Sequence, residues 1–204
     1  ERLDPFEALK AFPLLSKDEL QANFDRYLPA SLAKIPHYEC TTGGTSGNQL
    51  RFFVDDDSQA VETAFIHRMW ARVGYTPACR KATFRGVEFP SLKPGVYWQA
   101  NPIYNEMQFS PFHMSEATLP AYIDELRRYR PLYIHGYPSA VSLLADHAQR
   151  HGVRLDDLRV RAVLLGSEGM LPDQRESIER VFGCRVFSWY GHSERLVLAG
   201  ECEH

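Results

Sequence analysis

The sequence lacks the features that direct a chain into or across a membrane. No apolar run approaches the roughly 18 to 20 residues of a transmembrane helix. The first residues, ERLDPFEALK, also lack the basic-then-apolar pattern of a signal peptide. We therefore expect a cytoplasmic protein with no membrane partner.

Excess basic charge and paired cysteines are also missing. The 204 residues contain 23 Lys and Arg against 26 Asp and Glu, giving a formal net charge of -3 and no basic field for nucleic acid. The four cysteines (Cys40, Cys79, Cys184 and Cys202) show no CxxC spacing, and a chain of this length can bury a core without disulfides. We expect free thiols and no nucleic-acid partner, and a homodimer is an oligomeric state that the sequence allows.

The second half of the chain alternates helical and strand patterns. Apolar strands are expected at 131–134, 161–165 and 184–189. Helices are expected after Ser115, which is predicted to be the N-cap, from Pro138 to about Arg150, and from Pro172 to Phe182. The apolar face of the first of these helices carries Leu119, Tyr122, Ile123 and Leu126. Helices alternating with doubly buried strands predict an α/β fold with a largely parallel sheet, because parallel neighbours need crossover helices.

The first half has a less regular pattern. A capping box at Ser16–Glu19 predicts a helix over 16–26, and 51–54 predicts a strand. A longer helix is expected from the Asp55–Ser58 segment to Gly74, with a buried stripe of Val61, Phe65, Met69 and Val73. Proline, glycine and aromatic residues over 75–112 predict an irregular, β-rich insertion that forms a local subdomain or a pocket wall.

The segment Thr41–Leu50, TTGGTSGNQL, is rich in glycine and hydroxyl residues. Glycines at 43, 44 and 47 allow backbone amides to converge on an anion, which makes a phosphate the natural ligand. It is not a Walker loop, because Asn48 and Gln49 stand where the lysine would be. Taken alone, the segment favours a plain solvent-exposed turn over a phosphate cradle, because Gly/Ser/Thr clusters are common linkers.

Three polar segments, HGYPS, LGSEGM and WYGHSE, follow the predicted strands at the edge where ligands bind in such sheets. Tyr190 can stack on a base, and Glu194 can reach a magnesium ion held by phosphates. The 165–170 segment offers backbone groups to an adenine edge. The alternatives are a buried tyrosine with a solvated glutamate and an ordinary strand-to-helix turn.

The order and spacing of these segments resemble the adenylate-forming enzymes, specifically the phenylacetate-CoA ligase family and its capsular-polysaccharide-biosynthesis relatives. The likeness rests on the glycine loop, HGYPSAVSLLA, LLGSEGMLPDQRESIERVFG and WYGHSE, and it runs from about Leu14 to His204. It implies ATP-dependent activation of a carboxylic acid, with an aromatic acid among the candidates, with Mg²⁺ and with CoA as the acceptor. The chain begins without methionine and stops directly after an apolar run, so we expect 1–204 to be part of the large N-terminal domain, without the C-terminal lid and its lysine.

The resemblance also implies roles for individual residues. The phosphate loop corresponds to Thr42, Gly44, Thr45, Ser46 and Gly47, and the adenine-contacting turn to Ser167, Glu168 and Gly169. Tyr190 and Gly191 match the tyrosine-glycine motif, Glu194 its magnesium-binding acid, and His135, Gly136, Tyr137 and Pro138 the acid pocket. Catalysis is then expected from Thr42, Thr45, Ser46 and Glu194, with no general base, because a carboxylic acid is already ionised at pH 7. A noncatalytic relative, or a ligase that uses a saccharide or another acceptor, remains an alternative.

Other ligand-type residues are less informative. Cys202 and His204 provide two zinc-ligand types that residues further along could complete, although an incidental cluster is the favoured explanation. His192 lies inside the proposed site, and Trp98, Phe112 and Tyr137 are either core residues or the lining of an aromatic acid's pocket. The remaining histidines, His37, His67, His113, His147 and His151, are taken to show no ligand spacing to one another.

Overall fold

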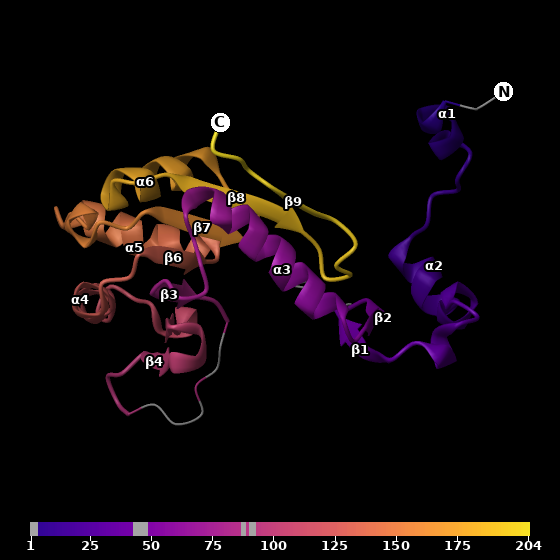
Figure 1. Ribbon diagram of the computed structural model, residues 1–204, viewed down its shortest axis with the longest axis horizontal. Coiled ribbons are helices and arrows are strands. Elements are labelled where there is room, and N and C mark those ends of the chain that lie inside the picture. Colours follow the sequence, from indigo (N-terminus) through magenta and orange to yellow (C-terminus); the bar gives the residue numbers. More distant parts are fainter. Residues whose placement is uncertain (1–3, 43–48, 87–88, 90–92) are drawn as a thin grey trace. The chain divides into compact units, whose positions relative to one another are not determined.

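The computed structural model describes residues 4–42, 49–86, 89 and 93–204 (Figure 1). The predicted phosphate-loop residues Gly44, Thr45, Ser46 and Gly47 lie outside these described residues. The chain divides into two compact units, Glu1–Gln59 and Ala60–His204. Each unit is described by itself.

The smaller unit contains short helices and one β-hairpin. Its elements are α1 (Pro5–Lys10), α2 (Lys17–Ala22), two 3₁₀ helices (Phe24–Tyr27 and Leu32–Lys34), β1 (His37–Thr41) and β2 (Arg51–Asp55). The Ser16 hydroxyl accepts a hydrogen bond from the Glu19 amide at 3.1 Å, which confirms the predicted N-cap. The α-helix ends at Ala22, earlier than predicted, because the chain continues as a 3₁₀ turn after Asn23.

The larger unit is built on a seven-stranded sheet in the order β4-β5-β3-β6-β7-β8-β9. The central strands β5, β3, β6, β7 and β8 run parallel, while the edge strands β4 and β9 run antiparallel to their neighbours. The strand bounds are β3 Lys81–Phe84, β4 Trp98–Asn101, β5 Glu106–Phe109, β6 Tyr133–Gly136, β7 Ala162–Gly166, β8 Val186–Gly191 and β9 Leu198–Gly200. The α/β prediction is confirmed, and the short strands within 75–112 are part of this main sheet.

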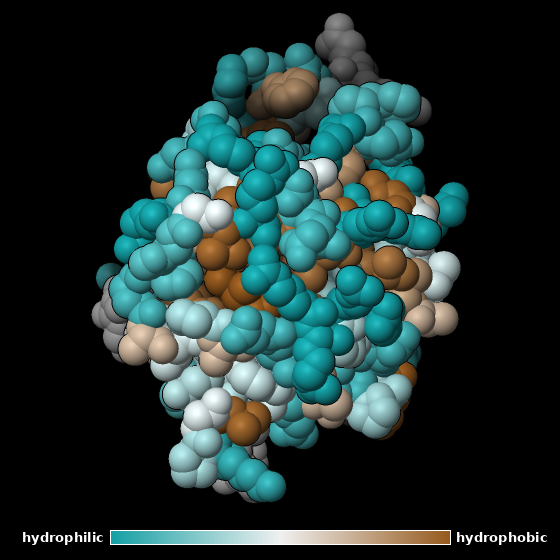
Figure 2. All heavy atoms as spheres, turned by 90° about the vertical axis from the view of Figure 1, so that its left-hand side faces the viewer, coloured by the Kyte–Doolittle hydropathy of each residue, from teal (hydrophilic) through white to brown (hydrophobic). Residues whose placement is uncertain are grey.

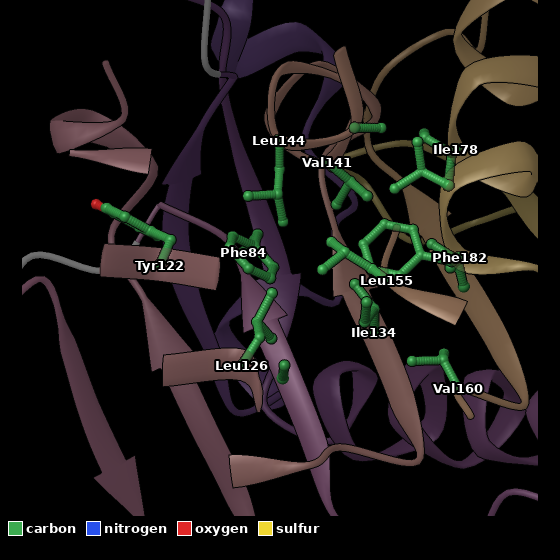
Figure 3. Packing of buried hydrophobic residues seen from close by; sticks show 14 of the residues in the cluster. Phe84, Tyr122, Leu126, Ile134, Val141, Leu144, Leu155, Val160, Ile178 and Phe182 are labelled. Atoms are coloured by element: carbon green, nitrogen blue, oxygen red, sulfur yellow. The ribbon is translucent and has the colours of Figure 1, made fainter. Parts of the chain in front are cut away.

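Helices cover both faces of the sheet (Figure 1). They are α3 (Ser58–Trp70), α4 (Leu119–Tyr129), α5 (Pro138–Arg150) and α6 (Pro172–Phe182), with 3₁₀ turns at Ala71–Val73, Pro102–Tyr104, Pro111–His113 and Asp156–Leu158. The main core lies between the sheet and α4, α5 and α6. Phe84 and Ile134 from the sheet and Leu144, Ile178 and Phe182 from the helices belong to this one buried cluster (Figure 3). A smaller cluster on the other face includes Trp70 and Tyr133.

The smaller cluster surrounds a buried ion pair. Lys81 on β3 and Glu106 on β5 are register partners, with Nζ 3.4 Å from Oε1. Their side chains are 10% and 8% exposed. Glu106 also accepts hydrogen bonds from Thr83, Asn101 and Gln108, so the carboxylate is held by four partners.

Other sequence expectations also differ in detail from the structure. Val61 and Phe65 are 52% and 61% exposed, because α3 packs on the sheet through Ile66, Met69, Trp70 and Val73, a stripe rotated from the predicted one. Ser115 is not the cap of α4: its carbonyl oxygen accepts from the amides of Thr118 and Leu119, and the helix begins at Leu119. The strand predicted at 131–134 is β6 at Tyr133–Gly136.

Polar residues dominate the surface on the side of α4, α5 and α6, and hydrophobic residues show between them (Figure 2). This agrees with the buried Leu119, Tyr122, Ile123 and Leu126 face of α4, as predicted. Within the described part of the chain, no helix has the length and apolar character to cross a membrane.

Candidate active site

The carboxyl ends of β7 and β8 open into a pocket of about 590 Å³, within the usual size range of small-molecule sites. Its lining consists of Ser167, Glu168, Gly169, Met170, Ser188, Trp189, Tyr190, Gly191, Ala199, Gly200 and Glu201. Five of the predicted nucleotide-contacting residues are among them, and they come from two loops that follow neighbouring parallel strands. The parallel register brings these loops together, because both strands end at the same edge of the sheet.

The turn at 167–169 is fixed by its neighbours. Ser167 has a φ of 70°, a left-handed conformation that is uncommon for a residue with a side chain. The Glu168 carboxylate accepts a hydrogen bond from the Ser139 amide at 3.0 Å. Since Ser139 lies in the first turn of α5, the negative charge sits at the positive end of the helix dipole. This bond ties the predicted adenine turn to the segment predicted to line the acid pocket.

Arg85 provides a second link between the same two segments. Its guanidinium donates to the Ser167 hydroxyl at 2.7 Å, lies 3.4 Å from Nε2 of His135 and covers the Tyr137 ring at 5.1 Å. β3 and β6 are neighbouring strands, but the chain continues from β3 to β4 and β5 on one side of this pair and from β6 to β7 on the other side. Arg85 follows β3 directly and therefore lies at a topological switch point of the sheet. The sequence pattern does not identify Arg85 as a site residue, because only the order of the strands in the sheet brings it close to Ser167 and His135.

His135 is a buried, uncharged residue under α3. Its Nδ1–H donates to the Leu164 carbonyl at 2.8 Å, and its ring meets the Trp70 ring edge-on at 4.8 Å. Burial, with a smaller contribution from the Arg85 guanidinium, lowers the pKa of His135 to about 3. His135 does not line the pocket at β7 and β8; it packs against Trp70 and contacts Arg85, and its role in binding the acid stays a prediction.

The next residues of the predicted acid-binding segment have distinct surroundings. A Cβ on Gly136 would lie 2.7 Å from the Phe84 carbonyl oxygen, so only glycine allows β3 and β6 to approach this closely. Tyr137 is half-buried against the main core, and Pro138 is buried at the first position of α5. Of the other proposed aromatic lining residues, Trp98 packs against the core and Phe112 is 66% exposed.

Tyr190 and Gly191 form the opposite wall of the pocket. Tyr190 is 65% exposed, which corrects the alternative of a buried tyrosine and leaves its ring available for stacking. A Cβ on Gly191 would lie 2.6 Å from the ring of Trp189, so glycine is required where the strand passes that indole. The Trp189 indole N–H is buried without a hydrogen-bond partner among the described residues.

Glu194 lies in the turn after β8 and is held by His192. The Val197 amide donates to Nε2 of His192 at 3.2 Å, so Nδ1 carries the proton. Nδ1–H then donates to the Glu194 carboxylate at 2.8 Å. Glu194 is 35% exposed, and its oxygen donors suit a hard cation such as Mg²⁺. Glu194 does not line the pocket at β7 and β8.

Thr42 is the one predicted phosphate-loop residue that the structure describes. Its amide donates to the Leu50 carbonyl at 2.9 Å, and its hydroxyl accepts from the Leu50 amide at 3.0 Å. The Thr42 hydroxyl therefore closes the base of the loop between β1 and β2. The expected contact between this loop and a phosphate stays a prediction.

The metal-ligand expectations need one correction. His147 and His151 lie one turn apart on α5 and meet Glu116, so the statement that these histidines show no ligand spacing was wrong. Cys202 is exposed, with Sγ 3.9 Å from the His204 carbonyl oxygen. Zinc at Cys202 and His204 stays a prediction.

Comparison with known proteins shows two relatives by sequence. The chain is 22% identical to Protein CapK of Staphylococcus aureus over 188 residues, which cover 91% of this chain and 41% of CapK. It is 32% identical to a phenylacetate-coenzyme A ligase of Pseudomonas putida over 81 residues, 40% of this chain and 18% of that enzyme. The chain thus spans less than half the length of these relatives. No family model matches it.

Solved structures show the same fold. A 2-hydroxyisobutyryl-CoA ligase in complex with 2-HIB-AMP, in the postadenylation state, matches 92% of this chain and 41% of its own, with a TM-score of 0.59 and 16% identity. A long-chain-fatty-acid-CoA ligase from Archaeoglobus fulgidus matches 80% of this chain and 33% of its own, with a TM-score of 0.53 and 10% identity. The chain therefore shares its α/β fold with the matched parts of these CoA ligases.

Proposed function

We propose that this chain is a member of the adenylate-forming superfamily and that it is the nucleotide- and acid-binding portion of an AMP-forming carboxylate ligase. CoA is the proposed acceptor. The observation that carries the proposal is the pocket at the ends of β7 and β8. Two loops separated in the chain supply its walls, and five residues assigned to nucleotide contact from sequence lie in them.

The proposed nucleotide site uses an exposed ring and a rigid turn. In this proposal the adenine stacks on Tyr190 beside Gly191, and backbone groups of 167–169 form hydrogen bonds with the edge of the adenine. The rigidity of that turn comes from the Glu168–Ser139 and Arg85–Ser167 hydrogen bonds. A site held in this way loses less entropy on binding than a mobile loop would.

The proposed reaction has two steps. A carboxylate oxygen of the acid attacks the α-phosphorus of ATP, the bond to the β-phosphate oxygen breaks, and pyrophosphate leaves. The acceptor thiol then gives up its proton to solvent, its sulfur attacks the acyl carbonyl carbon, and AMP leaves with the electron pair of the acyl–oxygen bond. The first step needs no general base, since the acid is ionised at neutral pH, so alignment and charge stabilisation lower its barrier.

Glu194 is the proposed ligand of Mg²⁺, which supplies charge stabilisation at the phosphates when bound. The residues fit this group, because Glu194 offers a partly exposed carboxylate whose orientation is fixed by His192. Thr42, Thr45 and Ser46 are proposed to donate to the phosphates, with Gly44 and Gly47 allowing close backbone approach. Arg85 and Tyr137, one on each side of the switch point, are proposed to orient the acid together with the 135–138 segment.

ATP–pyrophosphate exchange by the complete protein tests the proposal. The assay contains Mg²⁺ and a panel of arylacetic, aryl, fatty and amino acids. Exchange stimulated by one acid class establishes adenylation and identifies the substrate class. Product analysis with CoA then separates thioester formation from transfer to a saccharide or another acceptor. ATP binding without exchange for any acid would contradict ligase activity and favour a noncatalytic relative, consistent with the loop that has Asn48 and Gln49 in place of lysine.

The Glu194→Gln substitution tests the assignment of the metal ligand. We expect Mg²⁺-dependent exchange to fall by about 10²- to 10³-fold, because one charge-stabilising group is lost while the shape of the side chain is kept. Glu203→Gln, at an exposed glutamate near the same end of the chain, is the matched control and should keep full activity. Normal exchange by a folded Glu194→Gln variant would remove Glu194 from the mechanism.

A further inference from the structure

A cluster of metal-ligand side chains lies outside the proposed nucleotide site. His147 is in the last turn of α5, and His151 is the C-cap residue of the same helix. Their rings lie side by side, with centroids 4.4 Å apart. Glu116, in the turn before α4, approaches both rings although it is 31 and 35 residues away in the chain. We propose that Glu116, His147 and His151 bind a divalent transition-metal ion of the zinc type.

The distances fit a single ion. Oε2 of Glu116 lies 2.9 Å from Nδ1 of His147 and 3.5 Å from Nε2 of His151, and all three ligand atoms lie within 4.8 Å of one another. Zinc bonds of about 2.0 to 2.2 Å in tetrahedral geometry place neighbouring ligand atoms about 3.3 Å apart. Small side-chain adjustments therefore seat an ion between the three atoms. The His147 ring must then carry its proton on Nε2, so that Nδ1 presents a lone pair.

The ligand types select the kind of metal. Two imidazoles and one carboxylate suit zinc and its neighbours in the transition series, whereas Mg²⁺ and Ca²⁺ prefer ligand sets made of oxygen. Three protein ligands leave a fourth position for water. The set is thus distinct from the single carboxylate, Glu194, proposed to hold Mg²⁺.

The surroundings support a cation at this position. The carbonyl end of α5 carries the negative pole of the helix dipole, which stabilises positive charge at His147 and His151. His147 is buried, so its ring is held in place, while Glu116 and His151 are about half exposed and leave a path for entry. Arg150 binds Oε1 of Glu116 and so orients the carboxylate, with Oε2 turned to the histidines. The positive charge of Arg150 weakens metal binding, and we expect an affinity in the micromolar range.

The ion would join the turn before α4 to the end of α5. Both segments belong to the larger unit. The zinc proposal does not depend on the proposal that the chain activates an acid. Zinc titration of the tag-free complete protein, after treatment with a chelator, tests it. We expect one zinc ion per chain at this site by calorimetry. Co²⁺ should give the visible absorption of a four-coordinate complex.

Three variants locate the ion. His151→Gln and Glu116→Gln should each weaken zinc binding at least 10-fold, and the double variant Cys202→Ser/His204→Gln should leave it unchanged. Circular dichroism checks that each variant is folded. Glu116→Gln could disturb the fold, because Arg150 would lose its carboxylate partner. In that case the zinc affinity of His151→Gln decides the test, since His151 is exposed and its replacement should not disturb the fold. No zinc binding by the wild-type chain, equal affinity of His151→Gln, or loss confined to the Cys202/His204 variant would each overturn the proposal.

Discussion

The buried pair of Lys81 and Glu106 predicts an asymmetric response to mutation. Removing the lysine charge by Lys81→Met leaves the Glu106 carboxylate in the interior, with only the neutral donors of Thr83, Asn101 and Gln108. In the Glu106→Gln background, the same Lys81→Met change leaves no buried charge without a partner. The two backgrounds therefore separate the cost of an unpaired charge from the loss of lysine packing.

The expected magnitudes follow from the burial of the pair. The Lys81 and Glu106 side chains are 10% and 8% exposed, so water screens them little. We expect Lys81→Met alone to lower the free energy of unfolding by about 3 to 5 kcal/mol, as for other broken buried ion pairs. In the Glu106→Gln background the same change should cost less than about 1 kcal/mol, since the chain of methionine replaces most of the lysine stem.

Urea unfolding followed by tryptophan fluorescence and circular dichroism at pH 7 measures these differences. Arg180→Met is the matched control, because it breaks an exposed pair with Glu176 and should change the free energy of unfolding by no more than about 0.5 kcal/mol. Equal costs of Lys81→Met in the two backgrounds would refute the reasoning. Such a result would mean that Lys81 does not stabilise the buried charge of Glu106.

Three further predictions concern the larger unit. Burial lowers the pKa of His135 to about 3, below its unfolded value of 6.5, so stability from neutral His135 is full above pH 6.5 and decreases as the pH falls toward 3. Between pH 7 and 5 the wild type should lose about 2 kcal/mol more than His135→Asn in urea unfolding, and parallel pH profiles would contradict this. Gly136→Ala should lower the free energy of unfolding by about 1 to 3 kcal/mol, because the new Cβ would meet the Phe84 carbonyl oxygen. Gly169→Ala is the control and should change the melting temperature little, because the space around Gly169 is open. Equal melting temperatures of the two variants would show that β3 and β6 can move apart at no cost. Burial raises the pKa of the Cys184 thiol to about 12, so a thiol reagent at pH 8 should label exposed Cys202 at least about 100-fold faster; comparable rates, measured by mass spectrometry of the labelled peptides, would show that Cys184 is accessible.

The sequence predicted the parts of the fold that have local signals. Pro138 and Pro172 at helix starts and Gly183 after a helix end gave correct bounds for α5 and α6, because their backbone preferences act within one turn. The continuous apolar run at 161–165 indicated a doubly buried strand, and β7 lies inside the sheet. The burial of α3 was predicted less well, since the contact of this helix with the sheet selects Ile66 and Trp70 over Val61 and Phe65.

Sequence could predict those residues of the candidate site that lie in a motif directly after a strand. Ser167–Gly169 and Tyr190–Gly191 line the same pocket because parallel strands end at one edge. Arg85 and the cluster at Glu116 were not predicted, because both depend on contacts between distant segments. His147 and His151 carried a usable signal, the spacing of one helical turn, but their partner Glu116 comes from another part of the chain.

Arg85 also sets an order for the folding of the larger unit. Its hydrogen bond to Ser167 joins residues 82 positions apart, so it closes a long loop whose entropy cost must be met before the bond can form. During synthesis Arg85 leaves the ribosome well before β7 has been made, so its bond to Ser167 cannot form until that strand is in place. We expect the pocket wall to form late in refolding and to open early in hydrogen exchange, and we expect the strands beneath it to exchange among the last parts of the chain.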